Sequence, residues 1–298
     1  MALSLSARFW RFVLRTALKG SPLTVTESRA RSAQNARWMN RIPQGVFFES
    51  FQLEDLPAAW VRPTRATPGQ VFLYLHGGGY VQGSLANYRM LSGQLAETLQ
   101  IPLLFPDYRL APENPFPAAL EDALTAYRWL VGQGYAPEKI VICGDSAGGG
   151  LALATTLALR AAGDPLPAAV VCLSPWADLT LSGPSHQSQA QAEAVLTTAG
   201  LREWADLYRG SAPAENPLIS PVYADFQGFP PLLIQVGGDE ILLDDARAVA
   251  AKAQAAGVAV TLSVWPGLFH VWQALGDLIP ESQQAFAEIE QFAQINIC

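Results

Sequence analysis

Ser146 is the residue of this chain best suited to nucleophilic chemistry. It lies at the centre of G-D-S-A-G at residues 144–148, which fits the pattern G-x-S-x-G. The pattern is weak by itself because its residues are common, but here a run of β-branched residues precedes it and an alanine-rich stretch follows it. Between a strand and a helix, such a serine lies on a strained turn with its oxygen exposed, and small neighbours prevent clashes. The sequence therefore predicts a sharp turn that presents a nucleophile, and not a flexible loop.

A serine hydroxyl is a poor nucleophile near neutral pH, so a base has to take its proton. His270, in P-G-L-F-H-V-W, follows the last predicted strand, and a loop there can return it to the carboxyl edge of a sheet. Of the other two histidines, we expect His186 to be exposed in a polar stretch and His76 to orient its own loop. His270 is therefore the predicted general base.

The imidazole of such a base needs a carboxylate that fixes its tautomer and stabilises its protonated form. Asp239 comes directly after the apolar run L-L-I-Q-V-G-G, and we predict that it is this acid. Glu240, Asp244 and Asp245 are weaker candidates, and the last two are expected to cap the following helix. The resulting chain order of serine, acid and histidine is the order expected for α/β-hydrolases.

A glycine-rich stretch, H-G-G-G at residues 76–79, follows a predicted strand well before the serine. Successive glycines leave backbone N–H groups bare, and such groups can stabilise the oxyanion of a tetrahedral intermediate. A phosphate-cradling loop is the alternative, but the patterns G-x-G-x-x-G and G-K-[ST] are both missing from the sequence. We therefore expect this stretch to form an oxyanion hole.

Short apolar runs that alternate with helical stretches predict a single α/β domain over residues 1–298. Continuous apolar strands imply a mostly parallel sheet that helices cover on both faces. Eight strands are expected, the first two as an antiparallel pair, at residues 46–52, 58–62, 71–75, 102–105, 139–143, 169–173, 232–236 and 258–265. Helices are expected at residues 118–130, 147–162, 201–208 and 244–256. The strand at 258–265 would lie at the edge of the sheet, where it offers backbone groups for a homodimer.

Two segments do not fit this alternation. Residues 178–228 contain no predicted strand, and a connection that long is usually an insertion with a function, such as a lid. Near the N-terminus, Arg8, Arg11 and Arg15 recur at spacings of three and four, largely opposite the apolar residues, which predicts a basic amphipathic helix. We expect this helix to pack on its own protein, with a membrane surface as the alternative.

The composition excludes several classes of protein. Half of the 298 residues are hydrophobic, 15% are charged and the formal net charge is −7, which favours a globular core and argues against nucleic acid as a partner. Cys143 and Cys172 lie in strand-like runs, where we expect buried free thiols. The three histidines lack the spacing of metal ligands, so no metal site is expected. No apolar stretch approaches the roughly 18 residues of a membrane span, and no export signal is recognised, so a cytoplasmic location is expected.

Several motifs together resemble those of the bacterial hormone-sensitive-lipase-like esterases. They are H-G-G-G, D-Y-R-L-A-P-E at 107–113, G-D-S-A-G-G, S-P-W-A-D-L at 174–179 and the D-E-I-L-L-D run. The resemblance extends from about residue 40 to the C-terminus. It implies an α/β-hydrolase fold and a carboxylic ester hydrolase that acts on small-molecule esters with short-to-medium acyl chains and needs no cofactor. One departure is that Val-Trp follows His270, where Gly-Phe is commoner in the family.

The same resemblance implies roles for individual residues. It places the catalytic triad at Ser146, Asp239 and His270. It places the oxyanion-hole donors at the backbone N–H groups of Gly78, Gly79 and Ala147. It also implies a cap formed by residues 1–40 and roughly 180–228.

Three other functions stay open beside ester hydrolysis. An amidase or arylacetamide deacetylase would use the same triad, because the acyl chemistry is shared. A ligand-binding protein on this fold, like related plant hormone receptors, would lack the catalytic histidine that is present here. A lyase would use the oxyanion hole without forming an acyl-enzyme.

Other polar and aromatic residues are expected to have structural roles. We expect Asp107, Arg109 and Glu113 to form a charge network that supports the H-G-G-G loop, and Asp178 to stabilise a turn. Four tryptophans are candidates either for the lining of an apolar cleft or for ordinary core, namely Trp10, Trp38, Trp204 and Trp272.

Overall fold

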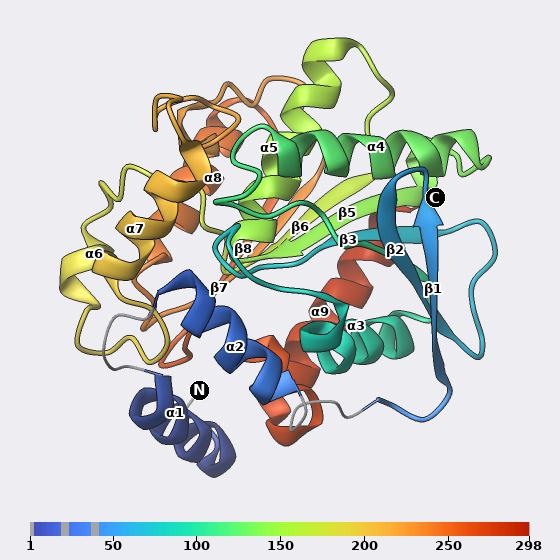
Figure 1. Ribbon diagram of the computed structural model, residues 1–298. Coiled ribbons are helices and arrows are strands. Elements are labelled where there is room, and N and C mark those ends of the chain that lie inside the picture. Colours follow the sequence, from blue (N-terminus) through green and yellow to red (C-terminus); the bar gives the residue numbers. More distant parts are fainter. Residues whose placement is uncertain (1–2, 19–23, 37–41, 298) are drawn as a thin grey trace.

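The computed structural model describes residues 3–18, 24–36 and 42–297 of the chain. These residues contain an eight-stranded sheet with the strand order β1-β2-β4-β3-β5-β6-β7-β8 (Figure 1). β1 pairs antiparallel with β2, and β2 with β4, while all other neighbours are parallel. The strands are β1 (Val46–Leu53), β2 (Leu56–Pro63), β3 (Val71–Leu75), β4 (Leu103–Pro106), β5 (Ile140–Asp145), β6 (Ala169–Leu173), β7 (Leu232–Gly237) and β8 (Val260–Trp265).

The predicted α/β sheet is confirmed, including the antiparallel first pair. β3 and β6 have the predicted bounds, and each end of the other strands lies within two residues of its expected position. β8 forms one edge of the sheet, as expected, and β1 forms the other.

Helices cover both faces of the sheet because successive strand residues point to opposite sides. Phe72 and Tyr74 of β3 pack with buried residues of α3 (Leu85–Leu99) and α9 (Pro280–Asn296) on one face. Leu73 and Leu75 pack on the other face, in a second cluster of buried residues. Three further helices cover this face of the sheet (Figure 1). These are α4 (Ala118–Gly132), α5 (Ala147–Ala162) and α8 (Leu243–Ala255). In the described residues, three short 3₁₀ helices lie between these elements, namely η1 (Pro137–Lys139), η2 (Pro221–Tyr223) and η3 (Trp272–Leu278).

The remaining helices come from the two segments that break the alternation. They are α1 (Leu5–Leu18), α2 (Val25–Ala36), α6 (Ser185–Ser188) and α7 (Thr198–Arg209), and they gather at the left of Figure 1. The N-terminal segment and the 178–228 insertion meet where Arg11 donates a hydrogen bond to the carbonyl oxygen of Ala192. As predicted, the insertion has no strand, and the basic N-terminal segment is helical.

Two further sequence expectations concern burial and membranes. Cys143 and Cys172 are buried free thiols, as predicted, whereas Cys298 lies outside the described residues. No helix in the described ranges combines the length and the apolar character that crossing a bilayer requires.

Candidate active site

Ser146 occupies a tight turn between β5 and α5. Its backbone has φ 51° and ψ −120°, a conformation that L-residues rarely adopt. A Cβ atom at Gly144 would lie 2.2 Å from the carbonyl oxygen of Gly148, and one at Gly148 would lie 2.0 Å from that of Leu75. The turn therefore excludes side chains at both glycines, and the sharp turn predicted from G-x-S-x-G is present.

His270 reaches this turn from the loop after β8. Its Nε2 lies 2.9 Å from Ser146 Oγ, and both residues are more than nine-tenths buried. This distance is within the range of a hydrogen bond through which an imidazole accepts a hydroxyl proton. Two of the three residues expected to form a triad are thus in contact.

The carboxylate that contacts His270 belongs to Glu240. Its Oε2 lies 2.8 Å from His270 Nδ1. Its other oxygen, Oε1, accepts hydrogen bonds from Ser174 Oγ at 2.6 Å and from the backbone N–H of Gly237 at 2.6 Å. Glu240 is fully buried, so these partners fix the carboxylate against the imidazole.

The prediction that Asp239 contacts the histidine was wrong. The Asp239 side chain points to α1, where its Oδ2 lies 2.6 Å from Arg11 Nη1, and about a quarter of it is exposed. After β7 the backbone turns, with the Glu240 N–H donating to the Gly237 carbonyl oxygen, so neighbouring side chains leave in different directions. Both carboxylates follow the same strand, and nothing in their residue types shows which of them faces inward.

The buried position of His270 affects its proton affinity. Burial alone lowers the pKa of His270, while the hydrogen bond and the charge of Glu240 act in the opposite direction. With smaller contributions from Glu193 and Asp145, they raise the pKa of His270 above its usual value. The arrangement favours the imidazolium, which is the form that arises when the serine gives up its proton.

Glu193 is a second buried carboxylate next to this pair, and sequence analysis did not single it out. It lies in the insertion and accepts hydrogen bonds from the N–H groups of Val195 and Leu196. Its Oε2 accepts another from the N–H of Ile241, the residue after Glu240, at 3.0 Å. The insertion therefore holds the loop that carries Glu240.

The H-G-G-G loop is fixed to the serine turn by Asp145. Asp145 Oδ1 accepts hydrogen bonds from the Tyr74 hydroxyl and the Gly77 N–H, and Oδ2 accepts one from the Tyr88 hydroxyl. Burial raises the pKa of Asp145 to about 6, although these three hydrogen bonds act in the opposite direction. His76 is buried and stacks on Tyr108 at 4.1 Å, in line with the expected role in its own loop.

Gly78 and Gly79 both have backbone conformations that favour glycine, with φ 109° and 64°. A Cβ atom at Gly79 would lie 2.1 Å from the Trp204 ring, so α7 rests directly on this loop. Tyr208, one turn further along α7, stacks on Tyr80 with ring centroids 3.6 Å apart. The insertion thus covers the glycine loop with two aromatic rings.

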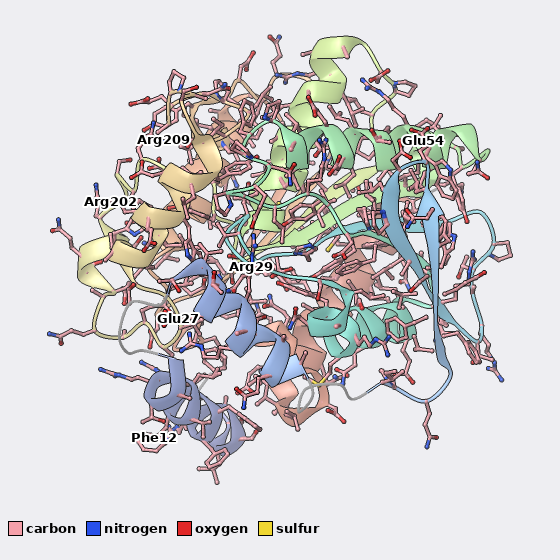
Figure 2. All side chains as sticks on the ribbon, in the orientation of Figure 1. Phe12, Glu27, Arg29, Glu54, Arg202 and Arg209 are labelled. Atoms are coloured by element: carbon pink, nitrogen blue, oxygen red, sulfur yellow. The ribbon has the colours of Figure 1, made fainter. Side chains whose placement is uncertain are left out.

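The charged residues of D-Y-R-L-A-P-E do not pair with one another. Arg109 pairs with Asp122, at 2.7 Å, and with Glu121. Glu113 pairs with Arg29 of α2, which also donates hydrogen bonds to the carbonyl oxygens of Val81 and Ala111. Figure 2 shows Arg29 at the centre of the view, pointing from α2 into the molecule. The expected network of Asp107, Arg109 and Glu113 is therefore not formed, and Arg29 joins Glu113 to the chain that follows the glycine loop.

The expectation that His186 is exposed was wrong. It is 5% exposed, and its Nε2 lies 3.8 Å from Asp245 Oδ1. Asp245 is buried and accepts hydrogen bonds from the N–H groups of Ala177 and Asp178, while Asp244 accepts one from Ser185 N–H. These aspartates anchor the insertion and are not the N-cap of α8, which is Leu242.

Other predicted roles have mixed outcomes. The Asp178 carboxylate accepts hydrogen bonds from the N–H groups of Thr180 and Ser182, which confirms its role in a turn. Trp272 is fully buried in a core cluster against which Trp10 packs, so these two belong to the core. Trp38 lies outside the described residues.

Within the described ranges, no group of three or more His, Cys, Asp or Glu residues could hold a metal ion.

Comparison with known proteins identifies the family. The model of a family described as having the alpha/beta hydrolase fold matches residues 72–274. An acetyl-hydrolase from Streptomyces hygroscopicus is 50% identical over 228 residues, which are 76% of each chain. An esterase from Acinetobacter venetianus is 35% identical over 81% of this chain and 82% of its own.

Solved structures agree with this result. An esterase from the bacterial hormone-sensitive lipase family superposes with a TM-score of 0.95, at 43% identity and full coverage of both chains. An esterase/lipase from an uncultured bacterium gives 0.94 at 38% identity over 99% of both chains. The chain therefore belongs to the α/β-hydrolase family and, within it, to the esterases of the bacterial hormone-sensitive lipase type.

Proposed function

We propose that the protein hydrolyses carboxylic esters through a triad of Ser146, His270 and Glu240. The observation that carries the proposal is the chain of two contacts, 2.9 Å from Ser146 Oγ to His270 Nε2 and 2.8 Å from His270 Nδ1 to Glu240 Oε2. A hydroxyl, an imidazole and a carboxylate in this order are what nucleophilic acyl transfer requires.

In the proposed mechanism, Ser146 Oγ attacks the ester carbonyl while His270 Nε2 takes its proton. Glu240 stabilises the resulting imidazolium, which then protonates the leaving alcohol as the tetrahedral intermediate collapses to an acyl-enzyme. Water repeats the cycle, with His270 again as the base, and releases the acid.

The oxyanion of the intermediate is proposed to bind the backbone N–H groups of Gly78, Gly79 and Ala147. Gly77 already donates its N–H to Asp145, so the donors of this loop begin at Gly78. Ala147 is the first residue of α5, and the N-terminus of a helix adds a partial positive charge next to the serine.

The assignment of the nucleophile is tested by Ser146→Ala. We expect kcat on p-nitrophenyl butyrate to fall by roughly 10⁴–10⁶-fold, while the exposed Ser211→Ala control keeps the wild-type rate. Stoichiometric labelling of Ser146 by an organophosphate is expected as well and separates this mechanism from a lyase without acylation. Ordinary activity in Ser146→Ala would contradict the proposal.

The proposed substrates are esters with short-to-medium acyl chains. The 50% identical relative is named an acetyl-hydrolase, and a 34% identical relative from Pseudomonas putida is named an ethyl acetate hydrolase. In this chain the Trp204 ring packs on Gly79, which brings a bulky side chain of the proposed cap next to the proposed oxyanion hole. Rates on p-nitrophenyl esters from two to sixteen carbons test this, and matched aryl ester and aryl amide substrates separate an esterase from an amidase.

α1, α2, α6 and α7 are proposed to form the cap of this site. The contacts of Arg29 with the loop around Val81, and of Trp204 with Gly79, connect both cap segments to the predicted oxyanion loop. The edge position of β8 supports a homodimer through this strand, which light scattering of the full chain would detect.

A further inference from the structure

α1 presents a stripe of large apolar side chains to solvent. Leu5, Phe9 and Phe12 are 82%, 59% and 66% exposed, and their spacing of four and three places them on one side of the helix. Figure 2 shows Phe12 at the periphery of the molecule. Exposure of such a stripe to water is unfavourable, so the stripe indicates an apolar partner.

The stripe is not needed to attach α1 to the protein, because another side of the helix does this. Ala7, Trp10 and Leu14 pack in or against the core cluster that includes Trp272. Hydrogen bonds from Ser4 to Glu281 and the ion pair of Arg11 with Asp239 hold the helix further. The stripe of Leu5, Phe9 and Phe12 therefore stays exposed on a helix that its other side attaches to the protein.

The charges around the stripe indicate which apolar partner it fits. Arg8 and Arg15 are exposed beside the stripe, and α1 contains no acidic residue, although the whole chain has a net charge of −7. Pairing of two α1 helices about a twofold axis would bring these arginines together, and like charges disfavour that. A membrane with anionic headgroups has a negatively charged surface above an apolar interior. It therefore matches both the arginines and the apolar stripe.

We infer that the outer face of α1, formed by Leu5, Arg8, Phe9, Phe12 and Arg15, docks the protein on anionic lipid surfaces. The apolar side chains enter the boundary between headgroups and acyl chains, and the two arginines bind lipid phosphates. Because Arg11 on the same helix pairs with Asp239, next to Glu240, the docked surface lies near the loop that carries the proposed catalytic acid. The inference does not depend on the proposed triad.

The test is co-sedimentation of the full chain with vesicles of phosphatidylcholine, with and without phosphatidylglycerol. We expect binding to the phosphatidylglycerol vesicles that weakens at high salt, and weaker binding to phosphatidylcholine alone. Leu5→Ser/Phe12→Ser and Arg8→Gln/Arg15→Gln are each expected to weaken binding about tenfold or more. Phe9 is left unchanged because its ring contacts Trp10.

The matched control is Phe47→Ser on β1, since Phe47 is 62% exposed and β1 lies at the opposite side of the molecule from α1 in Figure 1. Phe47→Ser should bind vesicles like the wild type and keep the wild-type rate on soluble p-nitrophenyl butyrate. Failure of the wild type to bind phosphatidylglycerol vesicles would overturn the inference. So would equal losses in the Phe47 control, or a stripe variant that only converts a dimer to a monomer. If the apolar variant does not fold, the arginine variant still decides.

Discussion

The serine turn at residues 144–150 and the acid loop at residues 237–242 both follow a parallel strand, yet only the first could be predicted to the residue. Ser146 lies where G-x-S-x-G places it, whereas the carboxylate next to His270 is Glu240 and not Asp239. The two loops differ in what determines their geometry.

In the serine turn, the backbone itself determines the position of the side chain. Glycines at 144 and 148 leave no room for a Cβ atom against neighbouring carbonyl oxygens, and this requirement is visible as glycine spacing. In the acid loop, side chains from distant segments decide which carboxylate faces inward. Ser174 holds Glu240 and Arg11 holds Asp239, and neither pairing has a local sequence signal.

The largest effect that we expect is a loss of stability on substitution of Gly148 by alanine in the serine turn. The new Cβ atom would lie 2.0 Å from the carbonyl oxygen of Leu75, a backbone atom that cannot move without disturbing the sheet. We expect the free energy of unfolding to fall by at least about 3 kcal/mol, measured by denaturant unfolding.

Gly132→Ala in α4 is the control for this substitution. A Cβ atom there meets nothing within 4 Å, so the change should be neutral or stabilise the fold by up to about 1 kcal/mol. If Gly148→Ala were as stable as this control, the view that the backbone fixes the serine turn would be wrong.

The acid loop is tested by removing each carboxylate charge in turn. Glu240→Gln should lower kcat by about 10³–10⁴-fold, because the imidazolium loses its buried counter-charge. Asp239→Asn should change kcat by less than about threefold, since a partly exposed ion pair contributes little. Both rates are measured on p-nitrophenyl butyrate.

The pH dependence of kcat/KM sharpens this comparison. The hydrogen bond and charge of Glu240 act against burial and raise the pKa of His270, and the reaction needs the neutral imidazole. The acid limb of the profile should therefore move to lower pH in Glu240→Gln and stay in place in Asp239→Asn. The reverse pattern would return the role of the acid to Asp239.

The same contrast explains how much of the rest could be predicted from the sequence. Strands of continuous apolar residues, such as Val71–Leu75, are visible locally, and all eight were found. α9 was missed although Phe286, Ile289 and Ala293 have helical spacing, so its signal was available. α2 has almost no apolar face, and its contacts run through Ser28 and Arg29 to the loop at residues 81–82.

α3 and His186 show how tertiary contacts override local patterns. α3 buries Ser92 and Gly93 within its apolar face, and a Cβ atom at Gly93 would lie 2.9 Å from Pro43, so packing required a residue that weakens the helical pattern. His186 lies in a polar stretch whose composition suggests exposure. Contacts with Asp244 and Asp245 at the start of α8 hold this stretch against the protein, and His186 is buried there.

The smallest effect that we expect is a pH dependence of stability that comes from Asp145, which joins the serine turn to the glycine loop. Because burial raises its pKa to about 6, the folded protein binds this proton more tightly than the unfolded chain does, whose carboxyl titrates near 4. Its contribution to stability is therefore fully present below about pH 4 and is lost as the pH rises through about 6.

Denaturant unfolding of the wild type and of Asp145→Asn between these pH values measures the difference. We expect the stability of the wild type relative to the variant to decline as the pH rises. A difference that grows with pH would mean that the hydrogen bonds from Tyr74, Tyr88 and Gly77 outweigh burial and that the serine turn is held by an ionised carboxylate. A constant difference would mean that the two effects cancel, and it would also contradict the prediction.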